Sequence, residues 1–131
     1  MSIQFNGIVP YLFYEDAAAA MDWYAEVFGF EDRGRWENDS GAVQNGEMRV
    51  GNTEVWMDGG GKQLFTREGD ERPQWIGVWV DDVDAMYERI QAAGVVAEPP
   101  VTREFGVRML TVPDPFGYHW GFIRRVDAAE G

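Results

Sequence analysis

The sequence predicts an α+β fold in which two modules of the same element order, strand–helix–strand–strand–strand, follow one another. In the first half, the strand-like stretch "IVPYLFYED" runs into the helix-like stretch "AAAAMDWYAEVFG", and in the second half "WIGVWVDD" runs into "VDAMYERIQAAG". Corresponding residues keep a nearly constant spacing, since Asp16 and Asp82 are 66 positions apart and Gly29 and Gly94 are 65 apart. A period of about half the chain is too long for a solenoid and indicates a duplicated module.

Both helices carry start and stop signals. Asp16 and Asp82 are suited to the N-cap, and Gly29 and Gly94 are suited to the left-handed position that follows a last helical turn. Each helix also has apolar residues at helical spacing, which predicts one buried face per helix: Met21, Tyr24 and Phe28 in the first, and Val83, Met86 and Ile90 in the second.

The strands that follow each helix are bounded by turn signals. In the first module, "FEDRGRWEN" precedes "EMRVGNTEVWMD", where Gly51-Asn52 is suited to a type II′ hairpin loop. In the second module, "VVAEPPV" precedes "GVRMLTVPDPFGYHWGFIRR". Pro99-Pro100 confines the former to a sheet edge, and residues 114–117, "DPFG", match a type I turn.

The chain is predicted to form a single domain over residues 1–131, with module one at about 1–58 and module two at 75–126. Residues 59–74, "GGGKQLFTREGDERPQ", replace periodicity with glycines and charges, which is typical of an exposed connection. A chain of 131 residues is long enough to bury roughly two thirds of its unfolded surface.

Composition excludes several classes of chemistry. The absence of cysteine rules out disulfides, thiolate metal sites and a cysteine nucleophile, and fits a cytoplasmic location. The net charge of −12 disfavours nucleic acid and anionic lipid as partners. No signal-peptide pattern follows Met1, and no apolar run approaches the roughly 20 residues that span a bilayer. We therefore expect neither a nucleic-acid partner nor a membrane.

Four stretches in this order resemble the vicinal-oxygen-chelate superfamily, which contains glyoxalase I, extradiol dioxygenases, fosfomycin-modifying enzymes and bleomycin-resistance proteins. They are "VPYLFYEDAAAAMDWYAEVFGFE", "EMRVGNTEVWMD", "WVDDVDAMYERIQAAG" and "VPDPFGYHWGF", and the resemblance covers nearly the whole chain. It implies paired βαβββ modules that form a curled mixed β-sheet with a concave pocket and with the helices outside. It also implies a homodimer.

Enzymes of that superfamily hold a divalent metal with four side chains, one on the first strand and one on a later strand of each module. Alignment of the two helix N-caps puts the first-strand positions at Val9 and Trp75. The resemblance, in which a later-strand glutamate follows a "DPxG" turn, implies that the later-strand position of module two is Gly121 and that the corresponding position of module one is near Trp56. None of these residues supplies a metal ligand, so the resemblance implies a member without the usual metal site. No cofactor is predicted.

A displaced metal site is the alternative. His119, the only histidine, shares a strand face with Gly121, and Glu54 and Asp58 share the face of Trp56. A site built from Glu54, Asp58 and His119 would need several ligands at unfamiliar positions. The simpler interpretation is that His119 is a polar wall residue of the pocket.

Aromatic side chains are predicted to line the concave face instead. By the strand period of two, Tyr11, Phe13, Trp56, Trp75 and Trp79 fall on this face, and Phe105 lies in a loop that could close over it. Such a lining favours planar or cationic ligands. A register slip of one residue would instead move Trp75 and Trp79 into the core. Core positions are predicted for four other large aromatics, Trp23, Phe28, Phe30 and Trp120.

Three functional hypotheses follow. The first is a metal-free protein that sequesters a small aromatic or cationic molecule, in the manner of antibiotic-resistance binding proteins. The second is a glyoxalase-type, metal-dependent lyase, isomerase or dioxygenase acting on a small oxygenated substrate. The third is a metal-free enzyme with His119 as general base, which would need a neighbouring carboxylate and a tuned pKa.

Overall fold

A computed structural model of the chain describes residues 2–59 and 75–126, and its backbone divides into two compact units, Met1–Leu64 and Phe65–Gly131. Each unit is described by itself. Except for Gly59, the predicted connection at 59–74 lies outside the described residues.

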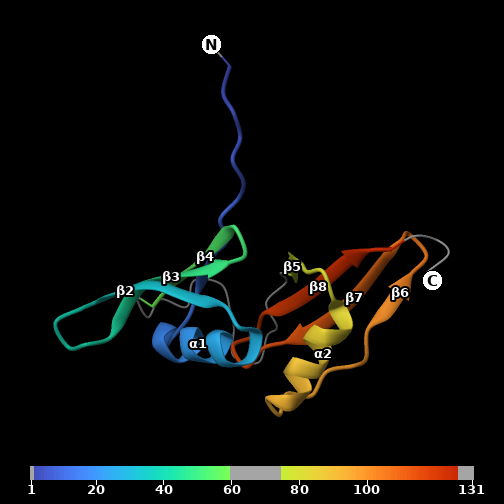
Figure 1. Cartoon of the computed structure of the whole chain (residues 1–131). Helices are drawn as coiled ribbons and strands as arrows, with labels where there is room; N and C mark the ends of the chain where they lie inside the picture. Colours follow the sequence, from blue (N-terminus) through green and yellow to red (C-terminus); the bar gives the residue numbers. More distant parts are fainter. Residues whose placement is uncertain (1, 60–74, 127–131) are drawn as a thin grey trace. The chain divides into compact units, whose positions relative to one another are not determined.

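The first unit is one four-stranded sheet with one helical segment (Figure 1). Its elements are β1 (Tyr11–Phe13), α1 (Ala17–Trp23), the π-helical turn η1 (Tyr24–Phe28), β2 (Glu31–Glu37), β3 (Val43–Val50) and β4 (Thr53–Asp58). The strand order is β1-β4-β3-β2. Strand β1 runs parallel to β4, and the other neighbours are antiparallel.

The second unit repeats this plan. It contains β5 (Trp75–Trp79), α2 (Val83–Ala92), β6 (Val101–Arg103), β7 (Val107–Pro113) and β8 (His119–Arg125), in the sheet order β5-β8-β7-β6. Strand β5 is parallel to β8, and the other pairs are antiparallel. The predicted α+β class and the order strand–helix–strand–strand–strand are thus confirmed in both halves, as two four-stranded mixed sheets.

The strand register relates the two units residue by residue. Tyr11 pairs with Trp56 in the first unit, and Gly77 pairs with Gly121 in the second, each five residues before the N-cap aspartate of its helix. Val9 and Trp75 were both expected on the first strand of their module. For Val9 this expectation is wrong, because β1 begins only at Tyr11, whereas β5 includes Trp75. Pro10 has no amide hydrogen to extend the ladder, which accounts for the shorter strand.

The helix ends form as the sequence indicates. Asp16 accepts a hydrogen bond from the Ala19 amide at 3.0 Å, and Asp82 accepts one from the Ala85 amide at 2.9 Å. Gly29 and Gly94 both have φ of +83°. The widening of the first helix into the π-helical turn η1, whose last turn is closed by the Gly29 amide donating to the Tyr24 carbonyl at 3.0 Å, was not predicted.

The turns between strands also match their sequence signals. Gly51 has φ of +63° and Asn52 has a negative φ, as a type II′ loop requires. Residues 95–100, which include Pro99 and Pro100, form no strand, and β6 starts at Val101 as a short edge strand. None of the helices in residues 2–59 and 75–126 is long and apolar enough to cross a membrane.

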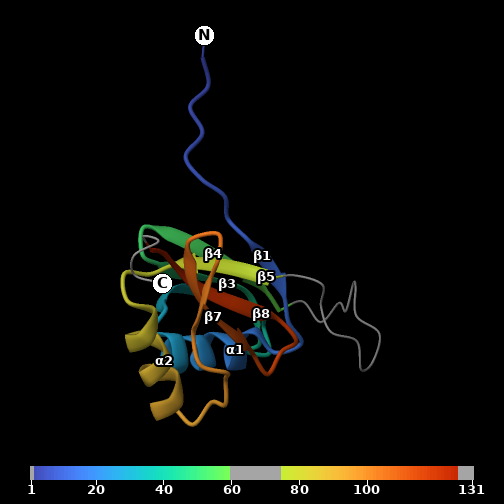
Figure 2. The same ribbon diagram turned by 90° about the vertical axis from the view of Figure 1, so that its right-hand side faces the viewer.

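The core of each unit lies between its helix and one face of its sheet (Figures 1 and 2). In the first unit, Tyr14 and Tyr24 are buried with their hydroxyls 2.7 Å apart, and a Cβ on Gly46 would overlap the sulfur of Met21. Phe28, Phe30 and Trp120 are buried as predicted, while Trp23 is half-buried. Other buried side chains include Leu12, Met21, Met48, Val55 and Met57 in the first unit, and Val83, Ile90, Leu110, Val112 and Phe122 in the second.

Asp114 holds the turn between β7 and β8 from inside the protein. One carboxylate oxygen accepts hydrogen bonds from the amides of Phe116 at 2.8 Å and Tyr118 at 2.9 Å, and the other accepts from the indole Nε1 of Trp120 at 2.8 Å. Asp114 is the one buried charged residue among those described. Because its carboxylate joins the turn to a core tryptophan, it sets where β8 begins.

Asp114→Ala should lower the free energy of unfolding by about 3 kcal/mol, because the change removes three hydrogen bonds and leaves buried donors without acceptors. Urea denaturation followed by circular dichroism measures this loss. Asp81→Ala, which removes an exposed carboxylate, is the matched control and should change stability by less than about 0.5 kcal/mol. Equal stability of the two variants would contradict this role of Asp114.

Candidate functional site

Each sheet has a second face, turned away from its helix, which we call the open face. Alternation along the strands directs Leu12 and Met57 to the buried face, so their neighbours Tyr11, Phe13 and Trp56 lie on the open face. In the second unit, Trp120 and Phe122 are buried, and Trp75, Trp79 and His119 lie on the open face. The structure therefore places these six predicted site residues on open faces, three in each unit.

The open face of the first unit carries an aromatic cluster. The rings of Tyr11 and Phe13 stack with centroids 5.7 Å apart and an angle of 3° between planes. The edge-to-face contact of Tyr11 with Trp56 has a centroid distance of 5.9 Å. The Tyr11 hydroxyl donates a 2.5 Å hydrogen bond to Oδ1 of Asn45. The cluster is thus fixed by strands β1, β3 and β4 together.

Two carboxylates of β4 lie beside this cluster. The indole Nε1 of Trp56 donates to Oε1 of Glu54 at 3.1 Å, and Asp58 pairs with Phe13 across β1 and β4. Burial, and secondarily the negative charge of Asp58, raise the pKa of the Tyr11 phenol above its usual value. Tyr11 therefore stays a neutral hydrogen-bond donor at physiological pH, and the face combines aromatic rings with negative charge.

Trp36 is an open-face aromatic that sequence reasoning missed. It pairs with Asn45 on β3, and its exposed indole lies along its own strand, where Cη2 would be 3.1 Å from a Cβ on Gly34. The signal was a glycine two residues before a tryptophan on a single strand, which places the glycine on the tryptophan's face.

On the open face of the second unit, the indole of Trp75 lies across two glycines. A Cβ built on Gly121 would overlap Cζ2 of Trp75, and one built on Gly77 would come within 3.0 Å of Cζ3. Trp75 is nevertheless 45% exposed, because only one side of the ring contacts the sheet. The result is a flat aromatic surface on the open face.

The space that Gly121 leaves on the open face beside His119 is not free for a ligand. The Trp75 indole occupies it, so a ligand would contact the outer side of the indole and not the glycine.

Trp79 is also exposed, but its ring already has a cationic partner within the unit. The guanidinium carbon of Arg125 lies 5.1 Å from the centroid of the Trp79 ring. Such cation–π contacts are favourable by about 0.5–1 kcal/mol at exposed sites. Trp79 therefore offers a ligand less free ring surface than its exposure suggests.

His119 and Phe105 lie at opposite ends of this sheet. His119 pairs with Trp75 on one side and with Pro113 on the other, so it lies beside the indole surface. Phe105 is exposed in the turn between β6 and β7, next to the Val107 end of β7. The structure thus brings His119 to Trp75 but does not bring Phe105 there.

The donor set at the four expected ligand positions does not fit a divalent metal, since Val9, Trp56, Trp75 and Gly121 offer no carboxylate or imidazole. Among the residues described within either unit, no three His, Asp or Glu side chains converge. Glu54 and His119 do occupy corresponding places in the two units. Glu54 lies two residues before Trp56, and His119 lies two residues before Gly121, which is the equivalent of Trp56. They belong to different units, however, as do Asp58 and His119.

Comparison with known proteins agrees with the fold. An uncharacterized protein of Mycobacterium bovis is 30% identical to the chain over 131 residues, covering 92% of the chain and 86% of that protein. Among solved structures, TioX from Micromonospora sp. ML1 has a TM-score of 0.75 and 29% identity, covering 93% of this chain and 100% of the other.

Two further solved structures share the fold at lower identity. The bleomycin-binding protein of Streptomyces verticillus, solved with copper(II)-bleomycin, has a TM-score of 0.69 and 23% identity, covering 92% of this chain and 97% of the other. Lactoylglutathione lyase from Agrobacterium tumefaciens has a TM-score of 0.71 and 18% identity, covering 93% and 95%.

The family model that describes this group matches residues 4–122, nearly the whole chain. Together with the duplicated unit and the 30% identical relative, this match shows that the chain belongs to the Glyoxalase/Bleomycin resistance protein/Dioxygenase superfamily.

Proposed function

We propose that this protein sequesters a small aromatic or cationic molecule on its open sheet faces, in the cytoplasm and without a metal. The observation that carries the proposal is the Trp75 indole, which lies flat over Gly77 and Gly121 with its outer side exposed. A ring held in this way can stack on a planar ligand without first being ordered, so little side-chain entropy is lost on binding. The cytoplasmic location rests on the absence of cysteine.

Two features favour a ligand with positive charge. The open face of the first unit sets the carboxylates of Glu54 and Asp58 beside the rings of Phe13 and Trp56. The net charge of −12 attracts cations to the protein as a whole. Within this chain, the Trp79 ring already makes a cation–π contact with the guanidinium of Arg125.

The fold supports binding and catalysis equally. Solved proteins of this fold include one that binds copper(II)-bleomycin and one named as lactoylglutathione lyase, both below 25% identity. The preference for binding therefore depends on the side chains of this chain, in which indole and glycine occupy the positions of expected metal ligands.

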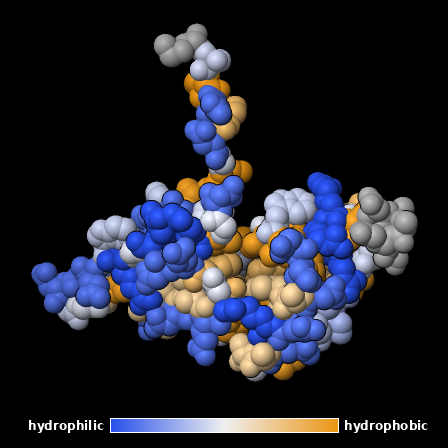
Figure 3. All heavy atoms as spheres, viewed as in Figure 1, coloured by the Kyte–Doolittle hydropathy of each residue, from blue (hydrophilic) through white to orange (hydrophobic). Residues whose placement is uncertain are grey.

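We also propose that the protein is a homodimer. Residues 2–10 form an extended segment before β1, and its apolar side chains Ile3, Phe5 and Ile8 are 81%, 92% and 86% exposed. Figure 3 shows apolar residues, in orange, along this segment. Exposed apolar surface of this extent is unusual in a monomer and is typical of a surface that another chain covers.

The first test uses proflavine, a planar aromatic cation, as the probe. Proflavine should quench tryptophan emission saturably, and Trp75→Ala should weaken its binding about tenfold because stacking and buried area are lost together. Trp79→Ala is the matched control and should weaken binding less, because Arg125 already covers part of that ring. Equal affinities of wild type and Trp75→Ala would contradict the proposal.

Gly121→Ala extends the same test without removing the ring. The added methyl needs the space of the Trp75 indole, so the ring must move and proflavine should bind less tightly. In the Trp75→Ala background the same change should have little further effect. Additive effects of the two substitutions would show that Gly121 does not act through Trp75.

Sedimentation equilibrium tests the dimer. The wild type should sediment with twice the mass of one chain at micromolar concentration. A variant with Ile3, Phe5 and Ile8 replaced by serine should dissociate at higher concentrations than the wild type does, since it has less apolar surface to bury. A monomeric wild type would contradict the dimer.

A metal-dependent, glyoxalase-type activity is the second candidate. It is favoured by Glu54 and His119, which hold corresponding places on the two open faces. Under the sequestration proposal, zinc, nickel and manganese should change the Tm of wild type and His119→Ala by the same small amount. A large increase in the wild type that His119→Ala abolishes would require a metal site that uses this histidine, and the second candidate would replace the first.

A further inference from the structure

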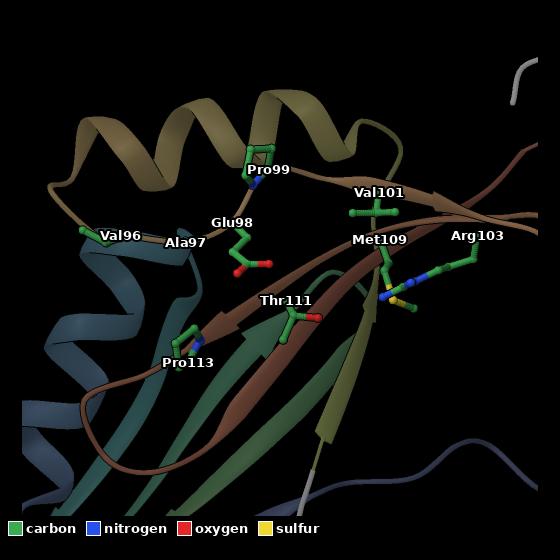
Figure 4. Close-up of a pocket in the computed structure, with 9 residues that line it drawn as sticks. All are labelled: Val96, Ala97, Glu98, Pro99, Val101, Arg103, Met109, Thr111 and Pro113. Atoms are coloured by element: carbon green, nitrogen blue, oxygen red, sulfur yellow. The ribbon is translucent and has the colours of Figure 1, made fainter.

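A pocket of about 550 Å³ lies beside strand β7 in the second unit (Figure 4). Its floor consists of Met109, Thr111 and Pro113 on the open side of β7, with Val101 and Arg103 on β6. Its wall is the segment 96–99, which leads from α2 into β6. The volume lies within the range of small-molecule sites, about 300–1,000 Å³.

The pocket lies one strand away from the surface formed by Trp75. Thr111 pairs with Gly121, over which the indole lies, and Pro113 pairs with His119. Neighbouring strands are about 4.8 Å apart, so the pocket floor begins one strand away from the indole. A molecule stacked on Trp75 could therefore extend into the pocket without leaving the open face.

Two charged side chains of opposite sign line this otherwise mainly apolar pocket. Glu98 is on the wall, and Figure 4 shows its carboxylate directed toward β7. Arg103 is on the floor at the end of β6. Over residues 2–59 and 75–126, neither side chain forms an ion pair with the other or with a third residue.

We infer that this pocket binds a small zwitterion whose apolar body packs on Val101, Met109 and Pro113. The basic nitrogen of the ligand would donate to the Glu98 carboxylate, and its acidic group would accept from the Arg103 guanidinium, which is suited to carboxylates and phosphates. The inference deepens the proposed function and rests on it for the aromatic part of the ligand, which would lie on Trp75.

Singly charged ligands fit this pocket less well. A purely cationic molecule would be attracted by Glu98 but repelled by Arg103, and a purely anionic one would meet the reverse arrangement together with the net charge of −12. A zwitterion satisfies both groups at once, because its positive group can face Glu98 while its negative group faces Arg103.

The test compares three probes with the same phenyl ring: L-phenylalanine, phenethylamine and 3-phenylpropionate. The full chain is labelled with ¹³C at the methionine methyls and ¹⁵N at the indoles, so that Met109 reports on the pocket and Trp75 on the indole surface. Met21, Met48 and Met57, buried in the first unit, are internal references. L-Phenylalanine should shift the Met109 methyl signal with a Kd about fivefold lower than either singly charged probe.

Charge variants separate the two contacts. Glu98→Gln should abolish the advantage of L-phenylalanine over 3-phenylpropionate, and Arg103→Gln should abolish its advantage over phenethylamine. Glu104→Gln, next to Arg103 but outside the pocket lining, and Arg33→Gln, in the first unit, are the matched controls and should preserve both advantages.

The two readouts distinguish failure of this inference from failure of the proposed function. If all three probes shift the Trp75 indole signal with one Kd and Glu98→Gln behaves like Glu104→Gln, the zwitterion pocket is wrong while aromatic binding stands. If no probe shifts either Trp75 or Met109 up to its solubility limit, both are overturned.

Discussion

Each sheet of this protein is paired with one helical segment, which covers one of its faces, and the distribution of side chains follows from that constraint. Strand periodicity divides every strand between a buried side and an open side. Leu12, Met57, Trp120 and Phe122 fill the buried side, as folding requires. The open side is therefore free of the demands of that core, and it carries the exposed rings of Tyr11, Trp75 and Trp79.

Two local arrangements make the open face of the second unit a defined surface. The buried carboxylate of Asp114 binds the turn amides and the Trp120 indole, which fixes the start of β8 and so the positions of His119 and Gly121. Glycine at 77 and 121 then lets the Trp75 indole lie against the backbone of the sheet. The hydrogen-bonded turn and the absence of Cβ atoms at 77 and 121 together give a ring that lies on the sheet and remains exposed.

Much of the fold could be predicted from the sequence because its signals are local. Asp16 and Asp82 cap helices through amides three residues away, and Gly51-Asn52 closes a hairpin between adjacent strands. The duplicated spacing related the two units in advance, and the period of two assigned Tyr11 and Trp75 to open faces. Each of these features depends on residues close in sequence or on a simple repeat.

What could not be predicted depends on tertiary packing and side-chain rotamers. Nothing in the sequence shows that the Trp75 ring turns onto Gly121, 46 residues away, or that Arg125 lies over Trp79. The π-helical turn at Tyr24–Phe28 and the late start of β1 after Pro10 also escaped the pattern. The sequence thus predicted that the site is aromatic, but it did not predict which surface of each ring a ligand would contact.

The contact of Trp75 with Gly121 also constrains how this chain can change. A carboxylate introduced at position 121 alone would collide with the indole, and loss of the indole alone would leave two bare glycines on an open sheet. The two positions are therefore epistatic: a side chain at 121 requires the indole of Trp75 to move, whereas beside a smaller residue at 75 it would not. The effect of a substitution at either position depends on the residue at the other.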